Sequence, residues 1–152
     1  MLPKLPFSNW ERTTRCFACS PNNPIGLKLK ITRDGDAVKT EFTPGELHEG
    51  WAGIVHGGIL FTLLDEVMSY VAIFDGVGAI TVKTELRFRQ SAQIGELLLA
   101  SAVPVRKTRR LIETRGIVTR KDGTVVAEAT ATMYVVKKNL RLSVSGTAES
   151  DS

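Results

Sequence analysis

The residues best suited to chemistry lie in one stretch, between the glycine pair Gly57-Gly58 and the carboxylates Asp65 and Glu66. Backbone N–H groups at the start of a helix are free and carry partial positive charge, so the glycine pair suits an oxyanion donor. Glycine also lacks the Cβ that would block an approaching carbonyl. An acid in apolar surroundings has a raised pKa and is a stronger base. The stretch therefore favours general-base attack of water on a carbonyl carbon.

The element that must position these residues is a helix within residues 55–74. It is apolar on nearly every face, and such a helix is normally buried. Gly57-Gly58 at one end and Asp75-Gly76 at the other predict its bounds. The stretch is too polar and too interrupted to span a membrane, which takes ~20 mostly apolar residues. Glu66 lies ~100° around the helix from Asp65, which favours a structural pairing for Glu66 over catalysis.

Strands surround this helix in the sequence. Two alternating segments flank a hairpin turn that contains Asp34-Gly35, and four more follow the helix, joined by short turns. The four are predicted to form an antiparallel meander, so the fold class is α+β. The six predicted strands cover residues 26–32, 37–43, 79–89, 96–105, 109–120 and 124–136.

In the strand at 79–89, two-residue alternation predicts that Ile80, Val82, Thr84, Leu86 and Phe88 face one way. The polar residues between them, which include Thr81, Arg87 and Arg89, are then expected on the other face.

The chain of 152 residues is predicted to be one domain with a substantial core. Residues 1–24 are predicted to be irregular, 25–138 to form the domain, and 139–152 to be a frayed tail. We find no charged leader followed by an apolar run, and two cysteines do not make a disulfide framework, so a reducing cytoplasm is expected. The net charge is +4, but aromatic residues that could stack on bases are not interleaved with the basic residues. This argues against nucleic-acid binding.

Four motifs stand out: Gly53-Ile-Val-His-Gly-Gly58, Leu63-Leu-Asp65, the Cys-rich opening at 16–27, and the strand from Ile80 to Phe88 with Ile94-Gly-Glu96 after it. Together they resemble the hotdog-fold acyl-CoA thioesterases, in the PaaI-like branch that includes phenylacetyl-CoA-type thioesterases. The resemblance covers about residues 16–137. It implies a long central helix wrapped by a curled antiparallel sheet of about six strands.

The resemblance also implies an activity, the hydrolysis of a fatty or aromatic acyl-CoA to the free acid and CoA. Asp65 would act as general base or nucleophile, the Gly57 N–H would polarise the thioester carbonyl, and Thr81 would position the water. Some members place an Asn or Gln in the loop before His-Gly-Gly as a second carbonyl donor. This chain has His48-Glu49-Gly50 there, so Glu49 holds the position of that donor. His48 or His56 could then take part in binding the carbonyl. Gly58 is expected to be a further substrate contact.

The spacing of Gly57 and Asp65 has a consequence for assembly. Eight residues of helix rise about 12 Å, and the backward lean of a side chain recovers only part of this. One helix therefore cannot easily hold both residues ~3 Å from one thioester. Two antiparallel helices across a two-fold axis would solve the problem, which predicts a homodimer, or a dimer of dimers, with composite sites.

Basic residues offer contacts for the phosphates of coenzyme A, since Arg and Lys are the usual partners of phosphate. Arg87, Arg89, Arg106 and Arg109 are the candidates. The coenzyme is part of the substrate, and no separate cofactor is expected. The side chains of Phe61, Met68, Trp51 and Phe74 could line an acyl pocket, although core positions are expected for most of them.

Cys16 and Cys19 have the spacing of half a zinc site, but the only histidines, His48 and His56, form no ligand pair, so no metal is expected.

Other functions stay open at this point. The strongest alternative is a non-catalytic acyl-CoA binder, such as a sensor or regulatory subunit on the same fold. A hotdog dehydratase is less expected, because its pairing of a catalytic His with a helix acid is not clearly present. A plain interaction module would have no affinity for acyl-CoA.

Overall fold

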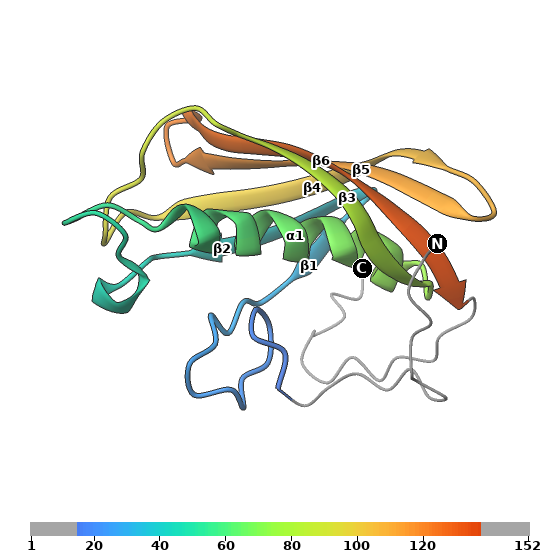
Figure 1. Ribbon diagram of the computed structural model, residues 1–152, viewed down its shortest axis with the longest axis horizontal. Helices are drawn as coiled ribbons and strands as arrows, with labels where there is room; N and C mark the ends of the chain where they lie inside the picture. Colours follow the sequence, from blue (N-terminus) through green and yellow to red (C-terminus); the bar gives the residue numbers. More distant parts are fainter. Residues whose placement is uncertain (1–14, 138–152) are drawn as a thin grey trace.

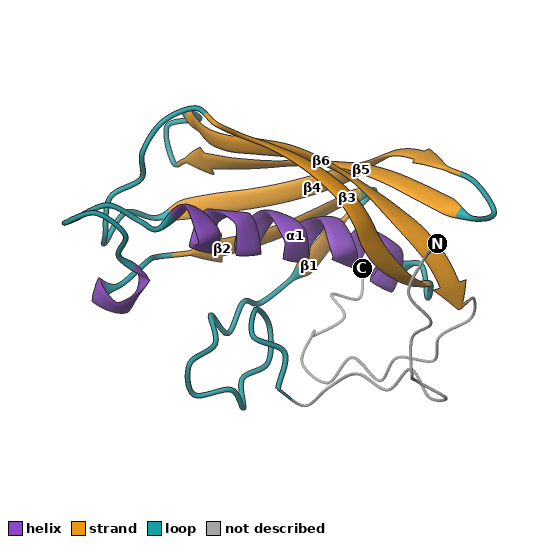
Figure 2. Ribbon diagram, viewed as in Figure 1, coloured by secondary structure: helices purple, strands orange, loops and turns teal. Residues whose placement is uncertain are grey.

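A computed structural model gives the fold for residues 15–137. One long helix, α1 (Gly57–Phe74), lies along the inner face of a curled antiparallel sheet of six strands (Figures 1 and 2). This confirms the predicted α+β, hotdog-type architecture. The strands are β1 (Thr32–Asp34), β2 (Ala37–Phe42), β3 (Gly78–Phe88), β4 (Leu98–Lys107), β5 (Leu111–Arg120) and β6 (Val125–Lys137), and a 3-10 turn, η1 (Glu46–His48), precedes the helix.

The predicted irregular segment at 1–24 lies mostly outside the described residues, and the predicted tail at 139–152 lies wholly outside them.

The helix begins and ends where the sequence predicts. His56 is its N-cap and Asp75 its C-cap. By length and mean hydropathy (1.5), α1 is long and apolar enough to cross a membrane. The prediction that its composition excludes a membrane span is therefore wrong. Its packing identifies it as the core helix, since it buries eight side chains among the core residues: Leu60, Leu63, Leu64, Val67, Met68, Tyr70, Val71 and Ala72.

The order of strands in the sheet is β1-β2-β4-β5-β6-β3. The predicted four-strand meander is therefore wrong for β3, which pairs with β6 at the far edge of the sheet and not with β4. Tight turns fix only the neighbours that they join, and the connection from Arg89 to Leu97 is not a tight turn. As a result, β3 is a long edge strand that follows directly on the helix.

The first strand is shorter than predicted. Leu27, Leu29 and Ile31 are buried at every second position, as alternation requires, yet β1 starts only at Thr32. Lys28 has a positive φ of 53°, which an extended ladder does not accommodate. The N–H groups of Leu27 and Leu29 donate instead to the carbonyls of Phe17 and Ala18. This segment therefore belongs to the turn that carries the cysteines.

A β-bulge in β3 overturns the predicted face of Thr81. The register with β6 shifts between Thr81 and Lys83, so that Val82 is the extra residue. Thr81 pairs with the buried Met133, and Lys83 pairs with Thr132 on the outer face. The bulge thus puts Thr81 on the helix side of the sheet, together with Leu86, while Lys83 and its neighbours stay outside.

Candidate active site

The first turn of α1 leaves one backbone donor free. The N–H of Gly58 donates to Nδ1 of His56 at 2.8 Å, and the N–H groups of Ile59 and Leu60 donate to the His56 carbonyl. Within residues 15–137 the N–H of Gly57 has no hydrogen-bond partner. Of the four orphan donors at this helix end, Gly57 therefore supplies the one that can bind a ligand oxygen.

His56 caps the helix. Because Nδ1 accepts from Gly58, that nitrogen carries no proton, and the ring is fixed in place. A Cβ on Gly58 would lie 2.9 Å from this nitrogen, which explains the second glycine. A Cβ on Gly57 would lie 3.1 Å from Cζ of Phe88. Phe88, which the sequence did not single out, therefore covers one side of the free amide.

Asp65 lies on the side of α1 next to the edge strand. The hydroxyl of Thr81 is 3.4 Å from Oδ1 of Asp65 and donates to it. Burial raises the pKa of Asp65, and the hydrogen bond from Thr81 lowers it by less. The structure thus brings Asp65 and Thr81 together, while Gly57 lies eight residues, or about 12 Å, away along the same helix.

The loop before α1 uses its polar side chains to hold itself. Nδ1 of His48 accepts from the N–H of Gly45 at 2.9 Å, and the His48 carbonyl accepts from the N–H of His56. A Glu49 oxygen accepts from the N–H of Gly53 at 2.6 Å. Glu49 holds the position expected for a second carbonyl donor, but an ionised carboxylate only accepts hydrogen bonds. Its role here is to close the loop that leads into the helix.

An open pocket of about 340 Å³ lies at the free amide. Gly57, Leu60 and Phe88 form its wall on the helix side, and Arg89 and Ser91 continue it along the chain after β3. Arg89 is held there by an ion pair with Glu128 at 2.6 Å. Of the four arginines proposed as phosphate contacts, Arg89 is the one that lines this pocket.

The other three arginines lie elsewhere on this subunit. Arg87 pairs with Glu128 in the ladder and shares the outer face of the sheet with Lys83. Arg106 and Arg109 flank Lys107, which forms an ion pair with Asp75 at the C-terminal end of α1. Since α1 has 18 residues, this basic turn is about 27 Å from Gly57 of the same chain. It could reach a Gly57 site only in a second subunit.

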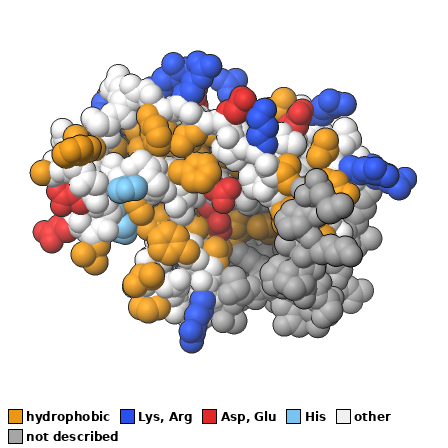
Figure 3. All heavy atoms as spheres, viewed as in Figure 1, with side chains coloured by type: hydrophobic (Ala, Val, Ile, Leu, Met, Phe, Trp, Pro, Cys, Tyr) orange, Lys and Arg blue, Asp and Glu red, His pale blue; other side chains and the backbone are white. Residues whose placement is uncertain are grey.

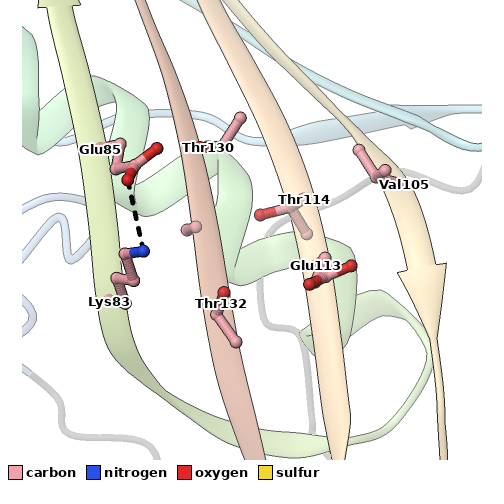
Figure 4. Close-up of a pocket in the computed structure, with 8 residues that line it drawn as sticks. Lys83, Glu85, Val105, Glu113, Thr114, Thr130 and Thr132 are labelled. Atoms are coloured by element: carbon pink, nitrogen blue, oxygen red, sulfur yellow. Dashed lines mark ion pairs between the residues drawn. The ribbon is translucent and has the colours of Figure 1, made fainter.

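A second pocket, of about 280 Å³, lies on the outer face of the sheet. Figure 4 shows Lys83 and Glu85 on β3 with Thr130 and Thr132 on β6 beside them, and α1 behind the sheet. Lys83 and Glu85 form an ion pair at 3.3 Å. The sheet separates this pocket from Asp65, and none of the predicted site residues lines it.

The apolar side chains considered for an acyl pocket divide into two groups. Met68 is buried in the core, and Phe74 packs edge-on against Tyr70. Phe61 and Trp51 are exposed, by 37% and 86%. Figure 3 shows hydrophobic side chains gathered on the face of the molecule that carries α1. Phe61 and Trp51 are therefore available to a ligand or a partner, whereas Met68 is buried and Phe74 is half-buried against the core.

A second cluster flanks the helix beside Asp65. One ligand atom each from Cys16, Cys19 and Glu66 lies within 4.8 Å of the other two. Burial raises the pKa of Glu66 to about 7. The hydrogen bond between the two thiols lowers the pKa of Cys16 and raises that of Cys19. Glu66 was expected to have a structural partner, and these two cysteines are its partners. Sequence spacing could not reveal this contact, because Cys16 lies 50 positions before Glu66.

Comparison with known proteins identifies the family. The family model of the thioesterase superfamily matches residues 52–127, which include Gly57, Asp65 and Thr81. The chain is 33% identical to the "Putative esterase" of Deinococcus radiodurans over 117 residues, covering 76% of this chain and 79% of that protein.

Two solved structures are similar in fold and in sequence. The protein smu.793 of Streptococcus mutans UA159, solved with bound acetyl-CoA, has a TM-score of 0.69 and 27% identity over 73% of this chain and 90% of that one. The phenylacetic acid degradation-related protein of Ralstonia eutropha JMP134 has a TM-score of 0.65 and 29% identity over 72% of this chain and 86% of that one. The chain therefore belongs to the thioesterase superfamily, as a thioester hydrolase of the hotdog, PaaI-like type.

Proposed function

We propose that the protein is an acyl-CoA thioesterase that hydrolyses a fatty or aromatic acyl-CoA to the free acid and CoA. Water is the only co-reactant, and the coenzyme is part of the substrate. The bound acetyl-CoA of the Streptococcus mutans relative supports this class of substrate. The observation that carries the proposal is the single free amide of Gly57, which opens onto a pocket wide enough for a thioester carbonyl.

The proposed reaction uses Asp65 and Thr81 at one end of the site and the Gly57 N–H at the other. Asp65 takes a proton from water as the water oxygen attacks the thioester carbon, and Thr81 holds that water through its hydroxyl. The carbonyl oxygen gains negative charge and is stabilised by the Gly57 N–H at the positive end of α1. When the intermediate collapses, the C–S bond breaks, and the thiolate of CoA leaves and takes up the proton.

The two ends of the site come from two copies of the chain. Asp65 and Gly57 of one helix are too far apart to act on one carbonyl, so a second subunit must supply one of them. The edge strand β3 has 11 residues, and a long free edge of this kind is normally paired or covered. If two β3 strands pair antiparallel about a two-fold axis, the two α1 helices lie antiparallel beside them, and two composite sites form.

Assembly of two such dimers into a tetramer would leave these sites intact. In the dimer, the basic turn with Arg106 and Arg109 at the end of one α1 approaches the Gly57 end of the other, which supports a role in binding the CoA phosphates. Cys16 and Cys19 are not joined in a disulfide, which supports a reducing compartment, and we place the enzyme in the cytoplasm.

A mixing experiment tests both the roles and the composite site. Asp65→Asn removes the base. Gly57→Pro removes the free N–H at the first helical position, where proline is well tolerated, and His56 already has the extended backbone that precedes proline (φ −59°, ψ 133°). Gly57→Ala is the matched control, because it adds a Cβ beside Phe88 and keeps the N–H.

Each of the first two variants should be inactive alone with an acyl-CoA panel and a thiol-release assay. When they are mixed and allowed to exchange subunits, about a quarter of the sites should be intact, because each mixed dimer regains one complete site. If the site lay within one chain, mixing would restore nothing.

A non-catalytic acyl-CoA binder is the second candidate, since the pocket at Gly57 could hold a thioester without cleaving it. In that case the wild-type protein would bind acyl-CoA, release no thiol, and keep its affinity in Asp65→Asn.

A further inference from the structure

Two segments that are distant in the sequence bring together three possible metal-ligand atoms, two thiol sulfurs and one carboxylate oxygen. Cys16 and Cys19 come from a turn near the start of the described chain, and Glu66 comes from the middle of α1. Sγ of Cys16 is 3.6 Å from Oε1 of Glu66. In a tetrahedral zinc site the ion is ~2.3 Å from a thiolate and ~2.1 Å from a carboxylate oxygen, so these two atoms stand about 3.5 Å apart. The observed spacing is therefore that of neighbouring ligands of one ion.

The turn that carries the thiols is held in shape by backbone hydrogen bonds. The N–H of Cys19 donates to Sγ of Cys16 at 3.5 Å, and the N–H of Ser20 donates to the Cys16 carbonyl at 3.1 Å. The turn is also tied to the buried segment after it, because Leu27 and Leu29 donate to the carbonyls of the two residues between the cysteines. This is a Cys-x-x-Cys arrangement, the usual spacing of a thiolate pair on zinc.

The helix supplies support around these ligands. The hydroxyl of Tyr70, one turn after Glu66, donates to Sγ of Cys19 at 3.3 Å, as residues behind a metal ligand commonly do. Cys16, Cys19 and Glu66 can each become an anion, so three such groups meet on this side of the helix. None of the ion pairs described among residues 15–137 involves Asp65 or Glu66. A cation bound between the thiols and Glu66 would relieve this repulsion.

We propose that Cys16, Cys19 and Glu66 bind a zinc ion, with water as the fourth ligand, which ties the N-terminal turn to the helix beside Asp65. Two thiolates favour zinc over Mg²⁺ or Ca²⁺, which take oxygen ligands. This revises the expectation of no metal, because the third ligand is a carboxylate 50 residues from the first cysteine and not a histidine. The ion is structural: the thioester hydrolysis proposed above uses no metal, and the two proposals stand independently.

The test begins with zinc content. The full chain, purified in reducing buffer and equilibrated with Zn²⁺, should hold about one zinc per chain after gel filtration, measured by elemental mass spectrometry. Cys16→Ser and Cys19→Ser should lose it, and Glu66→Gln should bind at least tenfold more weakly. Glu85→Gln, an exposed carboxylate on the outer face of the sheet, is the matched control and should keep its zinc. Replacement by Co²⁺ should give a thiolate-to-cobalt charge-transfer band that Cys16→Ser lacks.

A second measurement keeps the proposal open to refutation if a cysteine variant fails to fold. Removal of zinc from the wild-type protein with a chelator should lower Tm, and added Zn²⁺ should restore it. Zinc content no higher than in the Cys-to-Ser variants, or an unchanged Tm on chelation, would overturn the proposal. So would a Cys16–Cys19 disulfide in freshly purified protein, found as a loss of two hydrogens and of alkylation, since oxidised sulfurs cannot serve as thiolate ligands.

Discussion

Asp65 and Glu66 are neighbours on α1, yet their side chains face different parts of the molecule. Asp65 accepts a hydrogen bond from Thr81 on the edge strand, whereas Glu66 lies against Cys16 and Cys19. Burial raises the pKa of both carboxyl groups, and it raises that of Glu66 to about 7. A search for the most perturbed acid would therefore select Glu66. The comparison teaches that the groups opposite a buried acid, rather than its pKa, separate the catalytic role proposed for Asp65 from the structural role proposed for Glu66.

The largest expected effect comes from removing one carboxylate at a time. Asp65→Asn should lower kcat by ~10²-fold or more, because it removes the proposed general base while preserving the shape of the side chain. Glu66→Gln should lower kcat by ~10-fold or less, and its main effect should be on zinc affinity. Steady-state kinetics with one acyl-CoA, with circular dichroism to verify folding, measures both. An equal loss in the two variants would break the distinction between the two sides of the helix.

The hydroxyl of Thr81 on β3 offers a second test of the difference between the Asp65 side and the Glu66 side of the helix. Thr81→Val should lower kcat by ~10-fold with little change in KM, because one hydrogen bond that positions the water is lost. Thr81→Ser keeps the hydroxyl and should recover most of the activity. Thr130→Val, on the exposed face of β6, serves as the control for the same change of side chain. A Thr81→Val enzyme with wild-type kcat would show that Asp65 positions the water unaided.

A smaller effect is expected at the phosphate end of the substrate. Arg89 lines the pocket at Gly57, so Arg89→Ala should raise KM for acyl-CoA several-fold and leave kcat nearly unchanged. The difference should vanish with an acyl-pantetheine, which carries no phosphate. Arg115→Ala, an exposed arginine on β5, is the control. If the loss persisted with acyl-pantetheine, Arg89 would act through the pocket wall and not through phosphate.

The smallest effect concerns Asp75, a carboxylate at the end of the same helix whose surroundings are the reverse of those of Asp65. Burial alone would raise the pKa of Asp75, but Lys107 and Arg33 together lower it below its ordinary value. A lowered folded-state pKa adds stability above the unfolded pKa, and this stability is lost as the pH falls through the folded value.

Asp75→Asn should therefore reduce the free energy of unfolding by about 1 kcal/mol at pH 7, and by less near pH 3.5. Urea titrations of both proteins at the two pH values measure this gap, and a gap that widened at low pH would contradict the assignment.

Much of the architecture was predictable because it depends on local patterns. The helix bounds follow from Gly57-Gly58 and Asp75-Gly76, and the strands β4, β5 and β6 follow from alternation and tight turns. The place of β3 was not predictable in this way, because a long connection leaves the choice of neighbour to the packing of the whole sheet. The early start predicted for the first strand failed because the positive φ of Lys28 is not visible in an apolar–polar pattern.

For the site, the free amide of Gly57 and the acid at Asp65 could be proposed from residue type and helix position. The partner of Glu66 could not, since only folding brings Cys16 to α1. The role of Phe88 beside Gly57 was likewise missed, although a large aromatic at the end of a strand next to the His-Gly-Gly loop was a signal that could have suggested it.

The extra residue at Val82 in β3 determines which side chains of this strand face the helix. On one side of it, the odd position Thr81 turns toward the acid; on the other side, the odd positions Lys83 and Glu85 turn to the outside. Deleting Val82 would leave Thr81 and Lys83 as consecutive residues that already face opposite sides of the sheet, so regular alternation would return without rotation of either half of the strand. The Thr81 hydroxyl would then stay beside Asp65, and the charged groups would stay outside. Val82 is therefore the position in β3 at which deletion of one residue should be best tolerated.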